Sequence, residues 1–171
     1  MSAQHHLSVH AGNTWLSLEL AKKEAVQLHY SHTTLFALDI DLLWVENLTQ
    51  RPALAEKVEA FVSRFGRLQD HLGEKLLPRY AQLVGEQYKT QIDVLNFAER
   101  AGILVSADEF LAARKLRNAL VHEYMQDAQD FLDSLHLARQ SSQMLFDVIA
   151  KTEAELTRLG IEPPTGETSL S

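Results

Sequence analysis

The chain has 171 residues, which is the size of one domain and enough to bury a sizeable core. It contains no cysteine, which excludes disulfides, thiolate zinc sites and cysteine nucleophiles and suits a reducing compartment. Its formal net charge of −7 argues against a broad basic surface for nucleic acids, so any such contact should be local or supplied by a partner.

The ends and the apolar runs indicate a soluble protein. No apolar run is long enough to span a bilayer, and MSAQHHLSVH at the N-terminus lacks the basic and apolar regions of a signal peptide. We therefore expect a cytoplasmic location with no membrane contact. The expected organisation is a flexible N-terminus over residues 1–12, one helical domain over 13–160 and a flexible tail over 161–171.

Apolar residues recur at spacings of three and four in the first half of the chain, which is typical of helices with one buried face. Helices are expected over residues 13–30, 34–50 and 52–76. Pro78 should kink or end the third helix before a short apolar turn that closes near Gly85. The residues expected to cap or stop these helices are Asn13 or Thr14, Thr33 or Thr34, and the pair Arg51-Pro52.

The second half shows the same periodicity. A short helix through residues 92–98 should end at Gly102, and Ser106 to Glu109 reads as a capping box for a helix that starts near Ala107. Asp127 should cap a last long helix that ends by residue 160. No segment has a convincing period of two, so the predicted fold is an all-α helical bundle. In the helix from Ala107, the apolar residues Phe110, Ala113, Leu116 and Leu120 should face inward and leave Arg114 and Arg117 on another face.

The segment RKLRNALVHEY, residues 114–124, gathers three cations, a histidine and a tyrosine at the end of that helix. Arg117 and His122 are five positions apart, about 140° around an ideal helix. Both can face one ligand only if the helix ends or frays between them, or if a second chain supplies the missing group. Arginine suits phosphate and histidine moves a proton near neutral pH, so together they suit phosphodiester chemistry without metal.

The order Arg117, Asn118, three residues, His122, one residue and Tyr124 resembles the R-x4-H-x-Y signature of the HEPN superfamily. Within it, the chain is most similar to the HepT-like toxins that are paired with minimal nucleotidyltransferase antitoxins. The resemblance covers roughly residues 91–156, and the part before residue 89 is similar only as a set of helices of plausible length.

The resemblance implies an antiparallel HEPN helical bundle with additional short helices, acting as a homodimeric, metal-independent endoribonuclease toxin without a cofactor. The RNA 2′-hydroxyl would attack the neighbouring phosphorus while His122 moves a proton and Arg117 stabilises charge on the phosphate. Asn118 would orient the histidine or contact the phosphate. The cognate nucleotidyltransferase antitoxin would neutralise the toxin by attaching adenylate to Tyr124.

Each of these residues also has a structural interpretation. Arg117 and His122 can simply favour the dipole at a helix C-terminus, Asn118 can bond locally at the helix end, and Tyr124 can lie at the edge of the core. Arg114 and Lys115 are candidate RNA-binding residues, although a solvated helix face is the favoured interpretation.

Polar residues earlier in the chain have two interpretations as well. Arg64, Arg67 and Asp70 form a polar helix face that lines the same cleft or, as we favour, stays on the surface. His29 and His32 have a spacing that can chelate metal, but no carboxylate pair or cysteine is near in sequence, and no metal site is expected.

Two other functions compete with this one. The first is a non-catalytic HEPN subunit that docks a nucleotidyltransferase and holds a nucleotide phosphate, and the second is a purely structural helical dimer. The sequence does not separate catalysis from binding, because both need an arginine and a histidine.

Overall fold

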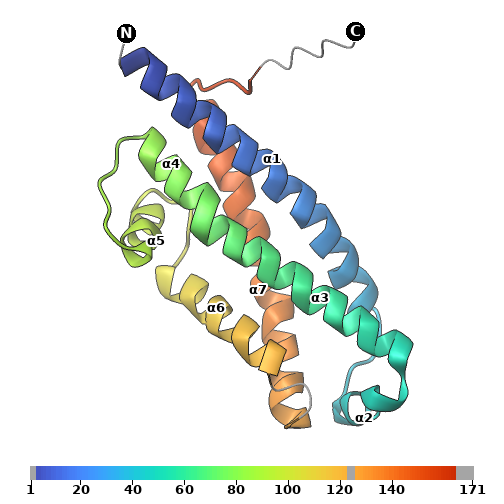
Figure 1. Ribbon diagram of the computed structural model, residues 1–171. Coiled ribbons are helices and arrows are strands. Elements are labelled where there is room, and N and C mark those ends of the chain that lie inside the picture. Colours follow the sequence, from blue (N-terminus) through green and yellow to red (C-terminus); the bar gives the residue numbers. More distant parts are fainter. Residues whose placement is uncertain (1–2, 123–125, 165–171) are drawn as a thin grey trace, which may run out of the picture.

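The computed structural model describes residues 3–122 and 126–164, and almost all of them lie in helices (Figure 1). No strand occurs in this part of the chain, so the all-α prediction is confirmed. None of its helices is long and apolar enough to cross a membrane. In chain order the elements are α1 (Ala3–Leu35), α2 (Leu42–Glu46), the 3-10 helix η1 (Leu48–Gln50), α3 (Pro52–His71), the π-helical turn η2 (Leu72–Leu76), α4 (Leu77–Leu83), α5 (Gln91–Arg100), α6 (Ala107–His122) and α7 (Ala128–Arg158).

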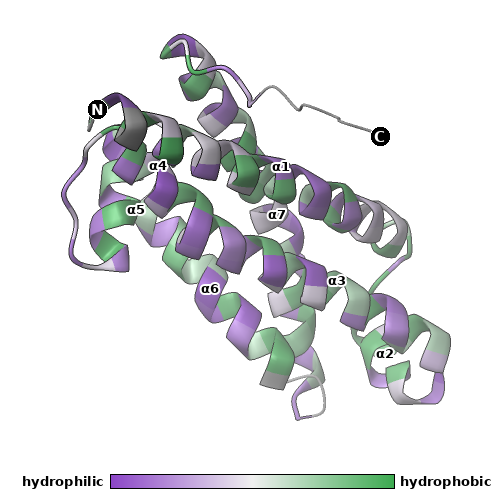
Figure 2. Cartoon of the chain, turned by 45° about the horizontal axis from the view of Figure 1, so that its top comes forward, coloured by the Kyte–Doolittle hydropathy of each residue, from purple (hydrophilic) through white to green (hydrophobic). Residues whose placement is uncertain are grey.

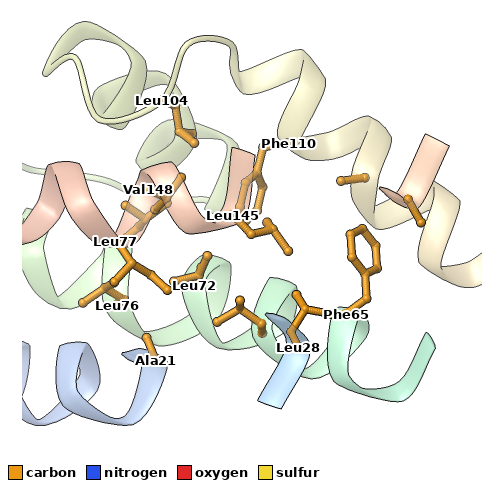
Figure 3. Close-up of a cluster of buried hydrophobic side chains, with 14 of the residues drawn as sticks. Ala21, Leu28, Phe65, Leu72, Leu76, Leu77, Leu104, Phe110, Leu145 and Val148 are labelled. Atoms are coloured by element: carbon orange, nitrogen blue, oxygen red, sulfur yellow. The ribbon is translucent and has the colours of Figure 1, made fainter. Parts of the chain in front are cut away.

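The helices pack as a bundle around one core. Helix α1 lies against α3, α4 and α7, and α6 lies against α3 and α7, so α3 stands between α1 and α6. Figure 1 shows α1 and the continuous α3–η2–α4 rod side by side and running in opposite directions. Hydrophobic and hydrophilic residues alternate around the helices (Figure 2), as expected where each helix buries one face. Buried side chains from several helices meet in Figure 3, among them Leu28, Phe65, Phe110 and Leu145.

Helix α1 is longer at both ends than predicted. Thr14 does not cap it, because its hydroxyl donates to the His10 carbonyl at 2.7 Å from within the helix. At the other end the Thr34 hydroxyl donates to the Tyr30 carbonyl at 3.0 Å. Such back-bonding satisfies a hydroxyl without ending a helix. Residues 3–12, which we expected to precede the helix, therefore form its first turns.

The prediction of one helix over residues 34–50 is wrong. After α1 the chain turns, and Asp41 adopts an extended backbone with φ −121° and ψ −177°. Its carboxylate accepts the Trp44 N–H at 2.8 Å and starts the short helix α2. The apolar spacing survives in the buried Val45 and Leu48, but it spans two short helices instead of one. An aspartate at an N-cap overrides the continuous periodicity.

Pro78 interrupts the third helix without ending it. The Leu77 N–H donates to the Leu72 carbonyl, five residues back, which makes η2 a π turn. A proline lacks an N–H and its ring clashes with the carbonyl four residues earlier, and a widened turn just before it accommodates both. Helix α4 then continues to Leu83, and Gly85 closes it with φ +78°.

The second half follows the prediction closely. Gly102 follows α5 with φ +76°, and Ser106 Oγ accepts the Glu109 N–H at 3.2 Å at the start of α6. Asp127 caps α7 by accepting the N–H groups of its first turn. Residues 165–171 of the predicted flexible tail lie outside the described residues. Buried residues of α7 recur at spacings of three, four or seven and include Phe131, Leu135, Ala138, Ser142, Leu145, Ile149 and Leu156.

Candidate functional site

A groove of about 560 Å³ runs between α3 and α6, and we call it the α3–α6 groove. It holds Arg117, the first residue of the predicted motif. Residues from three helices line it: Val58, Glu59, Val62, Ser63, Gly66, Arg67 and Asp70 of α3, Arg117, Leu120 and Val121 of α6, and Phe131 of α7.

Arg117 is anchored to α3 through one nitrogen. Its Nη1 lies 2.9 Å from Asp70 Oδ2 and donates to Asp70 Oδ1 at 3.2 Å. The two side chains are 35% and 26% exposed, so the pair is partly screened from water. The Nε and Nη2 groups of Arg117 donate to none of the described residues. Three of the five N–H donors of the guanidinium therefore have no partner among the described residues.

Gly66 makes room for Arg117 to lie across α3. A Cβ added at Gly66 would stand 2.8 Å from Arg117 Nε and 2.9 Å from Arg117 Cγ, closer than real Cβ contacts. A glycine inside a helix costs about 1 kcal/mol relative to alanine. Here the close approach of the arginine explains its presence.

The groove has a charged end and an apolar wall. Arg67, Asp70 and Arg117 lie together near Gly66, while most of the remaining wall is aliphatic or aromatic, including the buried Leu120 and Phe131, with the acidic Glu59 and the polar Ser63 among these residues. Val121 also lines the groove and is 58% exposed. A charged end beside an apolar wall suits a nucleotide, whose phosphate and base need these two surroundings.

The structure separates Arg117 from the neighbouring motif residues. Asn118 and Lys115 are exposed on α6 and neither lines the α3–α6 groove. Arg114 donates from Nη1 to Gln91 Oε1 and lies 4.0 Å from Glu74, so it holds α6 against α5 and η2. These contacts differ from the solvated helix face that the sequence favoured for Arg114, and its predicted RNA contact stays a prediction.

His122 is the last residue of α6, directly after the groove residue Val121. Five residues of helix advance about 7.5 Å, so its backbone is about that far along the axis from Arg117. The His122 side chain and the whole of Tyr124 lie outside the described residues, and their predicted roles stay predictions.

The positions of two groove residues contradict the interpretation that the sequence favoured for them. Arg67 and Asp70 line the groove with Arg117, so the view that they stay on a plain surface is wrong and the cleft alternative holds. Arg64, from the same predicted face, donates instead to Ser31 Oγ of α1 at 2.7 Å. The sequence signal for the difference is Gly66, since a glycine within a helix often marks a close approach.

His29 and His32 of α1 do not line the α3–α6 groove. His32 Nε2 is 3.1 Å from the Arg139 carbonyl, and burial lowers the pKa of His32. Within the described part of the chain, no group of three or more histidines, cysteines or acidic residues is placed to hold a metal ion.

Comparison of the chain with known protein families, with curated proteins and with solved structures finds no match. The resemblance to the HEPN superfamily, over roughly residues 91–156, stays a prediction, and the function is argued below from the α3–α6 groove.

Proposed function

We propose that the protein is a metal-independent endoribonuclease of the HEPN type, with its active site at the α3–α6 groove. The observation that supports this most is Arg117, which Asp70 fixes through one nitrogen while its other donors have no partner among the described residues. Arg67 adds a second cation at the same end. An anchored, forked guanidinium is suited to the equatorial oxygens of a phosphodiester as they gain charge.

The proposed reaction is a transfer within the RNA. The 2′-oxygen loses its proton and bonds to phosphorus, while the bond from phosphorus to the 5′-oxygen breaks and that oxygen gains a proton. The products are a 2′,3′-cyclic phosphate and a free 5′-hydroxyl. His122 moves protons in this scheme, and Arg117 stabilises the charged phosphate.

A homodimer would complete the site. His122 is about 140° around the helix from Arg117, so one straight helix does not direct both at one phosphate. Two copies of the segment meeting at a twofold axis would place an arginine and a histidine on opposite sides of one strand. They would also supply two histidines, one to take the proton and one to give it.

The proposed partner is a minimal nucleotidyltransferase antitoxin that adenylylates Tyr124. The added group would bring bulk and negative charge beside the phosphate position and would occupy Arg117. Activity should fall without unfolding. After co-expression with an active nucleotidyltransferase, the mass of the protein should rise by one adenylate, and Tyr124→Phe should escape both the modification and the neutralisation. Equal neutralisation of the phenylalanine variant would mean that the partner acts by occlusion.

The proposal is tested by incubating the purified protein with total RNA in the presence of a chelator and determining the chemistry of the new ends. We expect cuts with 2′,3′-cyclic phosphate and 5′-hydroxyl ends, and mapping them identifies the preferred RNA. His122→Ala protein prepared in the same way is the control for contaminating nucleases. RNA that binds but stays intact would favour the non-catalytic binding subunit. Cleavage that the chelator abolishes would contradict the proposal.

A further inference from the structure

A second, smaller pocket lies on the other side of Arg67. It has a volume of about 170 Å³ and is formed between α1 and α3, and we call it the α1–α3 pocket. Its lining residues are Lys23, Glu24, Gln27, Arg64 and Arg67. Arg67 lines both this pocket and the α3–α6 groove, so the two hollows adjoin across one side chain.

The α1–α3 pocket is cationic in a chain whose formal net charge is −7. Three of its lining residues are positive and one is acidic. Lys23 and Arg67 are exposed, and neither is within 4.0 Å of a carboxylate in the described part of the chain. Arg64 is held from one nitrogen, because its Nη1 donates to Gln27 O at 3.3 Å and to Ser31 Oγ at 2.7 Å. The pocket thus combines one cation that is held in place, Arg64, with two that have no carboxylate partner among the described residues, Lys23 and Arg67.

Glu24 does not cancel this charge in the way an exposed carboxylate would. Its Oε2 is buried and has no hydrogen-bond partner among the described residues. Burial raises the pKa of Glu24, against the opposing effects of His71, Arg67 and Lys75. Burial thus works against the carboxylate form, which is the form that would repel an anion.

We propose that the α1–α3 pocket is a second phosphate-binding site, which holds a neighbouring phosphate of the RNA strand whose scissile phosphate lies at Arg117. The inference rests on the proposed function and extends it by giving the strand a path across α3, from Arg117 past Arg67 to Lys23. Phosphate contacts of this kind position a strand and do not read its sequence. A local track of cations also reconciles RNA binding with an acidic protein.

Binding of uncleavable RNA tests this path. Oligonucleotides with 2′-O-methyl groups keep the phosphates but lack the attacking hydroxyl, and lengths of about two and about eight nucleotides compare one phosphodiester with several. Lys23→Gln should weaken the binding of the longer RNA several-fold at low salt and the binding of the dinucleotide much less. Its salt slope should fall by about 0.7 for the lost contact. The matched control is Lys22→Gln, because Lys22 is one residue away and already pairs with Glu153.

A second matched pair uses two arginines with the same anchoring. Arg79 donates from Nη1 to the Asn13 carbonyl and to Ser17 Oγ of α1, as Arg64 does to Gln27 and Ser31, but Arg79 lines neither hollow. Arg64→Gln should weaken the binding of the longer RNA, and Arg79→Gln should leave that binding unchanged. A similar loss in both variants would show that the anchoring to α1 matters and would overturn the second site.

The outcomes separate this inference from the proposed function. If Lys23→Gln and Arg64→Gln bind the longer RNA like the unaltered protein while Arg117→Ala binds weakly, the second site is overturned and the α3–α6 groove stands. If Arg117→Ala also binds and cleaves normally, the proposed function fails. If Lys23→Gln weakens the binding of inorganic phosphate and of both RNA lengths equally, the pocket holds free phosphate and the strand path is overturned.

Discussion

Gly66 and Arg117 form a pair in which a missing side chain on α3 makes room for a long side chain from α6. The glycine leaves space for the arginine stem, and Asp70, four residues further along α3, fixes the guanidinium. The position of the proposed phosphate-binding group thus depends on one atom that Gly66 lacks.

Replacing Gly66 with alanine should therefore separate stability from activity. Alanine favours the helix by about 1 kcal/mol, but its Cβ displaces Arg117 and breaks the pair with Asp70. We expect Gly66→Ala to stay folded, with a Tm close to that of the unaltered protein, and to cleave RNA far more slowly. Gly12→Ala is the control, since nothing lies within 4 Å of its added Cβ, and it should raise the Tm and keep full activity. Full activity in Gly66→Ala would show that the placement of Arg117 is not needed.

For single residues, the sequence predicted the chemistry of the candidate site better than the geometry of that site. The types and spacing of Arg117 and His122 suggested phosphate chemistry, yet nothing in the motif indicated that Asp70 and Arg67 stand beside the arginine. Both come from α3, where Asp70 lies 47 residues before Arg117 in the chain. Contacts between distant segments depend on how helices pack, which periodicity does not determine.

Helix α7 starts immediately after the motif segment and carries Phe131 into the α3–α6 groove. Its first turn depends on Asp127, whose carboxylate accepts the N–H groups of Gln129 and Asp130, each at 3.0 Å. These bonds satisfy donors that have no partner within the helix.

Removing this cap should loosen the end of the groove. We expect Asp127→Ala to lower the free energy of unfolding by about 1 kcal/mol, measured by urea denaturation, and Asp127→Asn to restore most of it. Asp133→Ala is the control, because Asp133 is exposed on the same helix and accepts only from the Gln129 side chain. An equal loss in both alanine variants would mean that the effect is one of surface charge and not of capping.

The elements that the sequence predicted well are those with local signals. Asp127, Ser106 and Gly102 mark helix ends through bonds and backbone angles that depend on near neighbours. The prediction was wrong where tertiary packing continued a helix and where a local cap interrupted an apolar pattern. Helix α1 runs through Thr14 because of its packing against α3, α4 and α7, and Asp41 starts a new helix within an unbroken apolar stripe.

For the whole molecule, the central proposal is that two copies share one site. If they do, mixing Arg117→Ala protein with His122→Ala protein after dissociation should restore part of the RNA cleavage that each variant lacks alone. The mixed dimer would carry one intact arginine and one intact histidine facing the same strand. Sedimentation should show a dimer at micromolar concentration. No recovery in mixed dimers would place the complete site within one chain.

The rate of RNA cleavage in chelator, measured under single-turnover conditions for Arg117→Ala, tests the account most directly. Arg79→Ala is the matched control, because it removes an arginine that also bonds across helices but lies outside the α3–α6 groove. Loss of one electrostatic donor from an active site typically slows catalysis about 100-fold to 1,000-fold. We predict a loss of that size for Arg117→Ala and for His122→Ala, with Arg79→Ala close to the unaltered protein. Cleavage by Arg117→Ala at the unaltered rate would contradict the account.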